Sequence, residues 1–292
     1  MTEPMKDGLP PSYQSLQSVK PTLSIVIPML HPRPESFGAI RGNLRAKCLL
    51  PQRVEWVLVC NGGERTASLC RDAFQEPGTP LNKHVIFGAT EASCNVGVAA
   101  AWNAGLAATE GALVLFLNDD AVPDAETVLR MAATLEARPD VGVVGVEGHN
   151  FEWNGPPPME RPNAGCFRGF ESWGIDERRQ HWKVPPKEGV ETQVVTGHCF
   201  MARRADLIEL DGFSLRYSPA FAEEYDFCFK MREILGKSVL TIPGHVRHAI
   251  GVSRPGGGFV YLTGSVQRDP LIINCNWRFH QRWHPESPVR GR

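Results

Sequence analysis

Short apolar runs alternate with longer amphipathic or alanine-rich stretches through the first half of the chain. The runs have the length of strands and are apolar at nearly every position, as in strands buried on both faces of a sheet. We predict strands at residues 23–27, 54–60, 84–87, 112–117 and 141–146. We predict helices at residues 37–47, 65–74, 95–108 and 123–137. This alternation predicts βαβ units, and therefore an α/β fold with a mainly parallel central sheet and helices on both of its faces.

The pattern changes in the second half of the chain. Residues 148–190 hold many of the prolines and glycines, so we expect long loops over a surface there rather than a second nucleotide-binding fold. Regular patterning resumes with a predicted strand at 192–202, a helix at 221–235 and a strand at 238–242. The Pro-, Ser- and Gln-containing residues 1–20 are expected to form a flexible leader.

Composition narrows the function classes. The chain has 292 residues, of which 42% are hydrophobic and 22% charged, as in an ordinary globular protein. A net charge of −1 and the lack of a Lys/Arg-rich run argue against nucleic acid as a partner. No apolar stretch approaches the roughly 20 residues of a membrane span, and the start lacks the apolar run of a signal peptide. The eight cysteines form no C-x-x-C, which predicts reduced core thiols in a cytoplasmic protein.

Three predicted strands end in small or polar residues. The first ends at Pro28-Met29, the second at Asn61-Gly62-Gly63, and the strand at 112–117 at Asn118-Asp119-Asp120. In open α/β sheets, ligands bind beyond the carboxyl ends of the strands. These strand ends therefore predict a single binding site.

Asp119 and Asp120 form an acidic pair with no basic residue beside them. Asp124 is explained as the cap of the next helix, but capping does not account for the two preceding acids. Adjacent carboxylates repel one another, and a divalent cation between them relieves that cost. A metal site and a plain solvated turn both remain open at this point.

The predicted helix at 221–235 carries a second acidic cluster. Glu224 shares an apolar stripe with Phe227, Met231 and Leu235, so we expect it to face the protein, where burial raises the pKa of a carboxyl and suits a general base. Alternatively, the acids simply favour the helix N-terminus, an explanation that fits Glu223 and also Asp226, which is spaced to pair with Lys230. His248 follows both acidic clusters near a strand end, where it is a surface, core or ligand residue.

Several segments in order resemble the family 2 glycosyltransferases with the GT-A fold, most closely the rhamnosyltransferase-like and galactofuranosyltransferase-like members. The resemblance runs from about Leu23 to His284. The segments that carry it are SIVIPML, VLVCNGG, NVGVAAAWNAGLAATEGALVLFLNDDAVP, VVTGHCFMARR, GFSLRYSPAFAEEYDFCFKMREILG and HAIGVS. The third contains a D-x-D-type motif in which Asn118 replaces the first Asp, and the fifth reads G-F-S-L where G-F-D-E is usual.

This resemblance implies an inverting glycosyltransferase that uses a nucleotide diphosphate sugar and a divalent cation, Mg²⁺ or Mn²⁺. It makes Asp120 the main metal ligand and His248 the residue that completes the metal shell. It makes Glu224 the base that takes the acceptor proton, with Glu223 orienting the acceptor or serving as the base itself. The family often has Asp where Glu224 stands, so the base assignment stays open between the two glutamates.

The resemblance also assigns binding residues. The expected nucleotide-sugar-binding residues are Pro28, Asn61, Asn95, Gly97, Asn118, Asp119 and Asp120, although Gly97 is also explained by a tight turn. The expected acceptor-binding residues are Gly197, His198 and Trp173. The aromatic residues between 150 and 182, among them Trp153 and Trp182, are candidates for an acceptor lid or for core packing.

The expected organisation is a GT-A domain at residues 21–266, with a donor-binding half at 21–147 and an acceptor-binding, catalytic half at 148–266. A C-terminal tail at 267–292 packs on the domain or makes peripheral membrane contact through Trp277 to Trp283. The expected donor is a UDP-, dTDP- or GDP-sugar. The expected acceptor is a saccharide, a lipid-linked sugar or another hydroxyl compound, in surface polysaccharide or glycoconjugate synthesis in the cytoplasm or at the inner face of the membrane.

Two alternative functions come from other classes of protein. A dinucleotide dehydrogenase needs G-x-G-x-x-G after a strand, and the sequence has none. A catalytically inactive sugar-nucleotide-binding protein remains the alternative, and intact Asp120, Glu224 and His248 argue against it.

Overall fold

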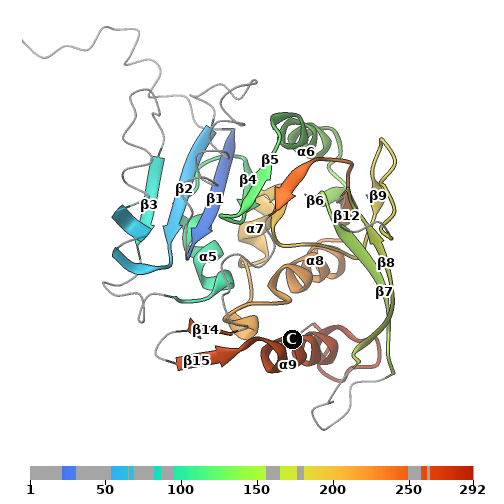
Figure 1. Cartoon of the computed structure of the whole chain (residues 1–292). Helices are drawn as coiled ribbons and strands as arrows, with labels where there is room; N and C mark the ends of the chain where they lie inside the picture. The colour runs from blue at the N-terminus through green and yellow to red at the C-terminus, as the bar shows by residue number, and fades with distance from the viewer. Residues whose placement is uncertain are drawn as a thin grey trace, which may run out of the picture.

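The computed structural model describes residues 22–30, 54–64, 66–68, 82–86, 95–155, 165–175, 181–248, 258–261 and 264–291. Its centre is an eight-stranded sheet with the strand order β3-β2-β1-β4-β11-β6-β12-β9 (Figure 1). The strands of this sheet are β1 (Leu23–Met29), β2 (Val54–Cys60), β3 (Asn82–Ile86), β4 (Leu113–Leu117), β6 (Val141–Gly145), β9 (Val190–Glu191), β11 (Cys199–Arg203) and β12 (Ser238–Thr241). The predicted α/β fold is confirmed.

The sheet is mixed and mostly parallel. Strands β3, β2, β1 and β4 run parallel to one another, and β6 is parallel to β12. Strand β11 is antiparallel to both of its neighbours, β4 and β6, and Cys199 at its start pairs with Leu117 at the end of β4. The segment that precedes β11 therefore lies at the same edge of the sheet as the carboxyl ends of β1, β2 and β4.

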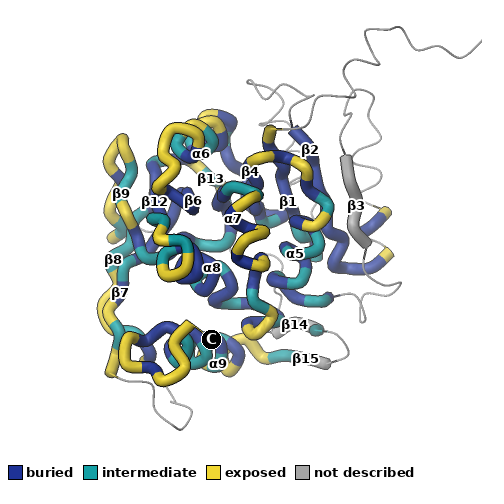
Figure 2. Tube along the Cα trace, turned by 180° about the vertical axis from the view of Figure 1, so that it is seen from behind, coloured by how far each residue is buried: buried dark blue, intermediate teal, exposed yellow. Residues whose placement is uncertain are grey.

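Helices cover both faces of this sheet (Figures 1 and 2). The helices are α5 (Val98–Ala108), α6 (Ala125–Ala137), α7 (Arg204–Glu209), α8 (Glu223–Glu233) and α9 (Arg268–Trp283), with a 3₁₀ turn η2 (Leu215–Tyr217) before α8. Side chains alternate along each strand, so Ile25 and Ile27 pack in one core with α6, whereas Val26 packs in the other with α5, α8 and α9. As predicted, Asp124 caps α6: its Oδ1 accepts a hydrogen bond from Thr127 N at 2.7 Å.

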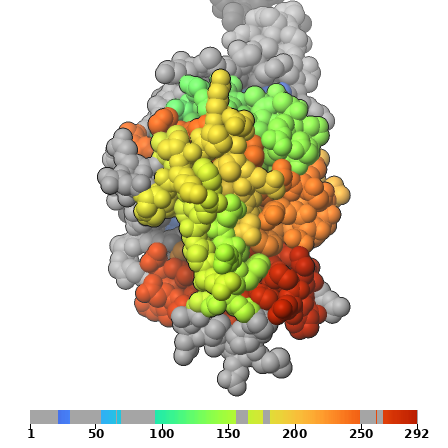
Figure 3. Space-filling model, turned by 90° about the vertical axis from the view of Figure 1, so that its right-hand side faces the viewer, coloured from blue at the N-terminus to red at the C-terminus, as the bar shows by residue number. Residues whose placement is uncertain are grey.

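The expectation of long loops at 148–190 is wrong for two described segments. Strands β7 (Gly148–Trp153) and β8 (Phe167–Trp173) pair antiparallel, and β10 (Val194–Val195) extends them to a three-stranded sheet. Figure 3 shows this part of the chain, in yellow-green to yellow, on the surface of one side of the molecule. Phe151 packs between Trp153 and Phe167 on one face of this sheet. The cause is an aromatic two-residue period in 149–153, which outweighs the surrounding prolines and glycines.

Three further details differ from the predicted elements. The predicted strand at 192–202 is two strands, β10 and β11, separated at Thr196–His198. Two short strands that the sequence pattern did not predict, β5 (Ala121–Pro123) and β13 (Val246–His248), pair antiparallel. Strands β14 (Gly258–Tyr261) and β15 (Gly264–Gln267) form a hairpin before α9.

The C-terminal helix α9 lays an apolar stripe against the domain. Its buried residues are Leu271, Cys275, Phe279, His280 and Trp283. Phe279 contacts Phe229 of α8 and Trp153 of β7, with ring centroids 5.0 and 5.6 Å away. Among the described helices, none combines the length and apolar character of a membrane span.

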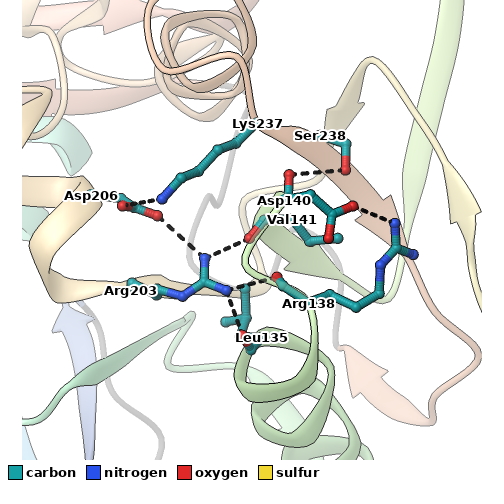
Figure 4. Close-up of polar contacts among 8 residues, drawn as sticks. All are labelled: Leu135, Arg138, Asp140, Val141, Arg203, Asp206, Lys237 and Ser238. Atoms are coloured by element: carbon teal, nitrogen blue, oxygen red, sulfur yellow. Dashed lines mark hydrogen bonds and ion pairs between the residues drawn. The ribbon is translucent and has the colours of Figure 1, made fainter.

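A polar network ties α6, β6 and β11 together at the opposite edge of the sheet from the strand ends described above (Figure 4). Arg203 donates to the carbonyls of Leu135, Arg138 and Val141, the last at 2.6 Å. Asp206 accepts from Arg203 at 3.4 Å and from Lys237 Nζ at 2.5 Å. Arg203 thereby satisfies carbonyls at the C-terminus of α6 that have no partner within the helix.

Some sequence predictions fall outside the described residues. These are the leader at 1–20, the helix at 37–47, most of the helix at 65–74, and Cys48, Cys70 and Cys94. The five described cysteines are buried and form no disulfide with one another, as the composition predicts. Burial raises the pKa of the Cys228 thiol to about 12, so this thiol stays protonated at neutral pH.

Candidate active site

The turn after β4 holds the predicted acidic pair in a buried position. Asn118 N donates to His198 O at 2.9 Å, which joins this turn to the segment before β11. Asp119 and Asp120 are only 9% and 8% exposed, which excludes a plain solvated turn. Burial, and next the neighbouring charge of Asp120, raise the pKa of Asp119 to about 7. Asp119 Oδ2 is buried and has no hydrogen-bond partner among the described residues.

Strand β13 brings His248 to this acidic pair. His248 pairs with Ala121 across the β5–β13 ladder, directly after Asp120 in sequence. Its Nε2 lies 3.2 Å from Asp120 Oδ1. The two residues that were predicted as metal ligands are 128 positions apart in the chain. This short ladder makes them neighbours.

A second histidine packs on the first. The rings of His198 and His248 are stacked, with centroids 4.5 Å apart and an interplanar angle of 8°. His198 is buried, and its Nδ1 lies 2.8 Å from Thr196 Oγ1 and 3.9 Å from Glu147 Oε2. His198 therefore lies behind His248. Its stacked ring and its contact with Thr196 support the position of the His248 side chain.

Glu147 is a site residue that the sequence analysis missed. It follows β6, whose carboxyl end lies at the same edge of the sheet as the end of β4, because β11 runs antiparallel to both strands. A Cβ on Gly174 would lie 2.9 Å from Glu147 Cγ, so the chain at Gly174 closes over this carboxylate. Glu147 directly follows the predicted strand at 141–146, so its position at a strand end is the signal that identifies it, as for Asp119 and Asp120.

The N-terminus of α8 delivers Glu223 and Glu224 to the same region. Ala222, before the helix, has a left-handed φ of 71°. Glu223 is buried and Glu224 half-buried. A Cβ on Gly197 would lie 3.3 Å from Glu224 Cδ, so the carboxyl group of Glu224 rests against the glycine that precedes His198. The small residue at 197 leaves room for this carboxylate.

Asp226 differs from its sequence interpretation. It is fully buried rather than a solvated acid at a helix start. Its carboxylate accepts hydrogen bonds from Tyr217 Oη at 3.0 Å and Trp283 Nε1 at 2.7 Å, and it forms an ion pair with Arg282. Lys230 Nζ instead donates to the carbonyls of Leu210 and Gly212, both at 2.7 Å. The pairing of Asp226 with Lys230 is therefore wrong, because Tyr217 of η2 and Arg282 and Trp283 of α9 are the partners of Asp226 instead.

The predicted donor-side residues form a tight polar network at the start of α5. Asn61 Oδ1 accepts from Val96 N at 2.8 Å, and Asn61 Nδ2 donates to Asn95 Oδ1 at 3.2 Å. Gly97 has a φ of +87°, and a Cβ there would lie 2.9 Å from the backbone of Pro219. Asn61, Asn95 and Gly97 thus have structural roles, and contact with a donor stays a prediction. Pro28 is half-buried within β1.

Aromatic residues border the site on the side of β7 and β8. Trp182 lies against Gly174 and contacts the ring of His149 at 5.1 Å between centroids. Trp173, the last residue of β8, is half-buried and has Lys183 Nζ 5.2 Å above its ring. Trp153 instead packs against α9, so it is a core residue and not part of a lid.

The site suits a divalent cation that has few protein ligands. Among the described residues, no group of three or more His, Cys, Asp or Glu is arranged to hold a metal ion. Asp120 and His248 are adjacent, and the buried Asp119 Oδ2 is an oxygen that a cation would satisfy. Carboxylate oxygens and one imidazole fit Mg²⁺ or Mn²⁺, which leave coordination positions for phosphate oxygens.

Comparison with known proteins identifies relatives. Residues 24–211 match the family model described as Glycosyl transferase family 2. Among solved structures, the chain is similar to a mannosyltransferase, PcManGT from Pyrobaculum calidifontis, in complex with GDP-Man and Mn²⁺, with 18% identity and a TM-score of 0.53 over 77% of this chain and 56% of that one. It is also similar to GalNAc-T7 with UDP, GalNAc and Mn²⁺, with 14% identity and a TM-score of 0.58 over 79% of this chain and 44% of that one.

At these identities the structural likeness establishes the fold alone. The chain spans about half the length of the two solved structures that it matches. A sequence comparison with curated proteins gives no match.

Proposed function

The chain belongs to glycosyl transferase family 2, and from this premise we propose that it transfers a sugar from a nucleotide diphosphate sugar to an acceptor hydroxyl, with inversion at the anomeric carbon. One observation carries the proposal. The acidic turn after β4, His248 of β13 and Glu224 of α8 all contact the Thr196–His198 segment, although they are distant in sequence.

Asp120 and His248 would hold the cation, and an oxygen of Asp119 would face it as a third ligand. A bound cation of this kind supplies positive charge to the leaving diphosphate. The Mn²⁺ ions in the two similar solved structures support a divalent cation here. Mg²⁺ and Mn²⁺ are both proposed.

Glu224 is the proposed base, with Glu223 as the alternative. Inversion requires the acceptor oxygen to attack the anomeric carbon opposite the leaving diphosphate, while a carboxylate removes the proton of that hydroxyl. Glu224 is half-buried beside Gly197, with its Oε2 turned inward, whereas Glu223 is only 4% exposed as a whole residue. This difference favours Glu224 for direct contact with an acceptor and Glu223 for holding the helix start.

The nucleotide-sugar is proposed to bind along Pro28, Asn61, Asn95, Gly97 and the Asn118–Asp120 turn. The acceptor is proposed to bind over Gly197 beside Trp173 and Trp182, because aromatic faces stack on sugar rings. The proposed donor is a UDP-, dTDP- or GDP-sugar, with rhamnosyl and galactofuranosyl donors included. The acceptor is a saccharide or lipid-linked sugar, in surface polysaccharide or glycoconjugate synthesis at the cytoplasmic side of the membrane.

A thermal-shift screen tests this function. A panel of UDP-, dTDP- and GDP-sugars is added with and without Mn²⁺, and we expect one donor to raise Tm only when the metal is present. Asp120→Asn should abolish that shift. A donor that stabilises the protein but is neither transferred nor hydrolysed would favour an inactive binding protein, and no stabilisation by any donor would contradict both.

A further inference from the structure

A cavity of about 650 Å³ lies among α5, α7, η2, α8 and α9, and none of the candidate active-site residues lines it. Figure 2 shows α5, α7 and α8 together on this face of the molecule. Its volume is within the range of pockets that hold small organic ligands.

Positive charge dominates the lining of this cavity. Arg204, Arg216, Lys230 and Arg282 contribute cations, whereas Asp211 contributes the single carboxylate. This local excess contrasts with the net charge of −1 for the whole chain. A concave surface of one sign concentrates ligands of the opposite sign, because the low-dielectric walls focus the field.

Two of these cations are largely buried, and Lys230 donates to the carbonyls of Leu210 and Gly212 rather than to a carboxylate. Lys230 is 8% exposed, and the Arg282 side chain is 11% exposed and paired with Asp226 at 3.0 Å. Burial lowers the pKa of Lys230, the nearby carboxylate of Asp226 opposes this shift without reversing it, and the charge of Arg282 adds to it. An anion in the cavity would offset the repulsion between the two cations.

Arg204 is preorganised for an anion. Its Nε donates to Thr109 Oγ1 at 3.1 Å, which fixes the guanidinium plane. Its Nη1 and Nη2 have no hydrogen-bond partner among the described residues. A guanidinium held in this way presents two parallel donors, the geometry that matches phosphate oxygens.

Apolar side chains complete the lining. Leu106 is buried, whereas Ile208 and Leu215 are 52% and 59% exposed and rank among the large hydrophobic residues that the fold leaves in solvent. An inorganic anion alone would leave these apolar side chains exposed to water. A ligand with an anionic end and an apolar body would satisfy both parts of the cavity.

We propose that this cavity binds a phosphate ester with an apolar organic group, with the phosphate at Arg204 and Arg216 and the apolar group against Leu106, Ile208 and Leu215. The ligand is either a free phosphate ester or the headgroup region of an anionic lipid, since both present this chemistry. The site is independent of the sugar transfer proposed above.

Binding of decyl phosphate, measured by isothermal titration calorimetry in EDTA, tests the proposal, because chelation removes metal-dependent phosphate binding at the active site. The double variant Arg204→Gln/Arg216→Gln should weaken binding at least about tenfold, the loss expected for charge-assisted hydrogen bonds. Arg168→Gln is the matched control. Arg168 of β8 is exposed, forms an ion pair with Glu152 of β7 and does not line the cavity. It should change the Kd less than about twofold.

Two further arms separate the ligand sources. Vesicles of phosphatidylcholine with and without phosphatidic acid are tested by co-sedimentation. Anionic vesicles that bind wild type but not the double variant would assign the site to a lipid, and decyl phosphate binding without vesicle binding would assign it to a free ester. No decyl phosphate binding below about 1 mM, or equal Kd values for wild type and a folded double variant, would overturn the proposal.

Discussion

At the scale of single residues, the candidate site is a row of ionisable side chains in contact. Glu147 lies near His198, His198 stacks on His248, and His248 lies 3.2 Å from Asp120. These contacts hold each side chain of the row in place against its neighbour. Asp119, the residue before Asp120, and His198 allow separate tests.

Asp119 should make the metal-free protein less stable as the pH rises. The folded carboxyl has a pKa of about 7, above its ordinary value of 3.8, so between these pH values the folded state holds a proton that the unfolded chain has released. The free energy of unfolding therefore falls across this interval, by at most about 4 kcal/mol, and the loss is complete above pH 7.

The variant Asp119→Asn removes this effect. In EDTA, its Tm advantage over wild type should grow between about pH 5 and pH 8. Differential scanning calorimetry at several pH values measures it. An advantage that stays constant or shrinks across this range would contradict the buried, protonated carboxyl.

His198 should act as a positioning residue for His248. Side chains behind a metal ligand typically contribute 10- to 100-fold to metal affinity. We expect His198→Ala to weaken Mn²⁺ binding by about tenfold or more, and His198→Phe, which keeps a flat ring for stacking, to weaken it less. Electron paramagnetic resonance of free Mn²⁺ gives both Kd values, and an unchanged Kd in folded His198→Ala would refute the role.

At the scale of elements, α8 has two functions. Its first residues carry Glu223 and Glu224 to the site, and its interior anchors the C-terminal helix through Asp226. The anchor also fixes the helix start, because Asp226 N donates to Ala222 O directly before the two glutamates. The placement of the proposed base thus depends on α9.

Asp226→Ala should therefore cost about 3–5 kcal/mol in the free energy of unfolding, since it leaves buried Arg282 without its carboxylate. Glu233→Ala is the matched control on the same helix, where the Glu233–Arg290 ion pair is 37% and 43% exposed and is expected to contribute less than about 1 kcal/mol. Urea denaturation compares the two. Similar losses for both variants would show that the buried ion pair is not the anchor.

The sequence predicted those elements best in which every residue is buried, because their apolar runs are visible in the sequence. The apolar runs of β2 and β4 are buried at every position, and their predicted bounds agree with the structure to within a residue. Strands β5 and β13, with three residues each, are too short for a periodic signal and exist because they pair with one another. Thr196–His198 breaks a strand that the pattern continues, and this break creates the site.

At the scale of the whole molecule, the sheet order explains which site residues could be foreseen. The parallel strands place the ends of β1, β2 and β4 at one edge, so Asp119 and Asp120 were predictable from strand ends. The stacking of His198 on His248 and the burial of Asp226 depend on packing between segments that are distant in sequence. No local pattern encodes such contacts.

The central claim is that Asp120 binds the cation and Glu224 takes the proton of the acceptor hydroxyl within one site. The most direct test measures donor affinity with Mn²⁺ and the rate of transfer for Asp120→Asn, Glu224→Gln and Glu223→Gln. We expect Glu224→Gln to lower kcat by about 10²- to 10⁴-fold with an unchanged donor Kd, and Asp120→Asn to lose metal-dependent donor binding. Wild-type rates in both glutamate variants, or metal-dependent donor binding that survives in Asp120→Asn, would contradict the account.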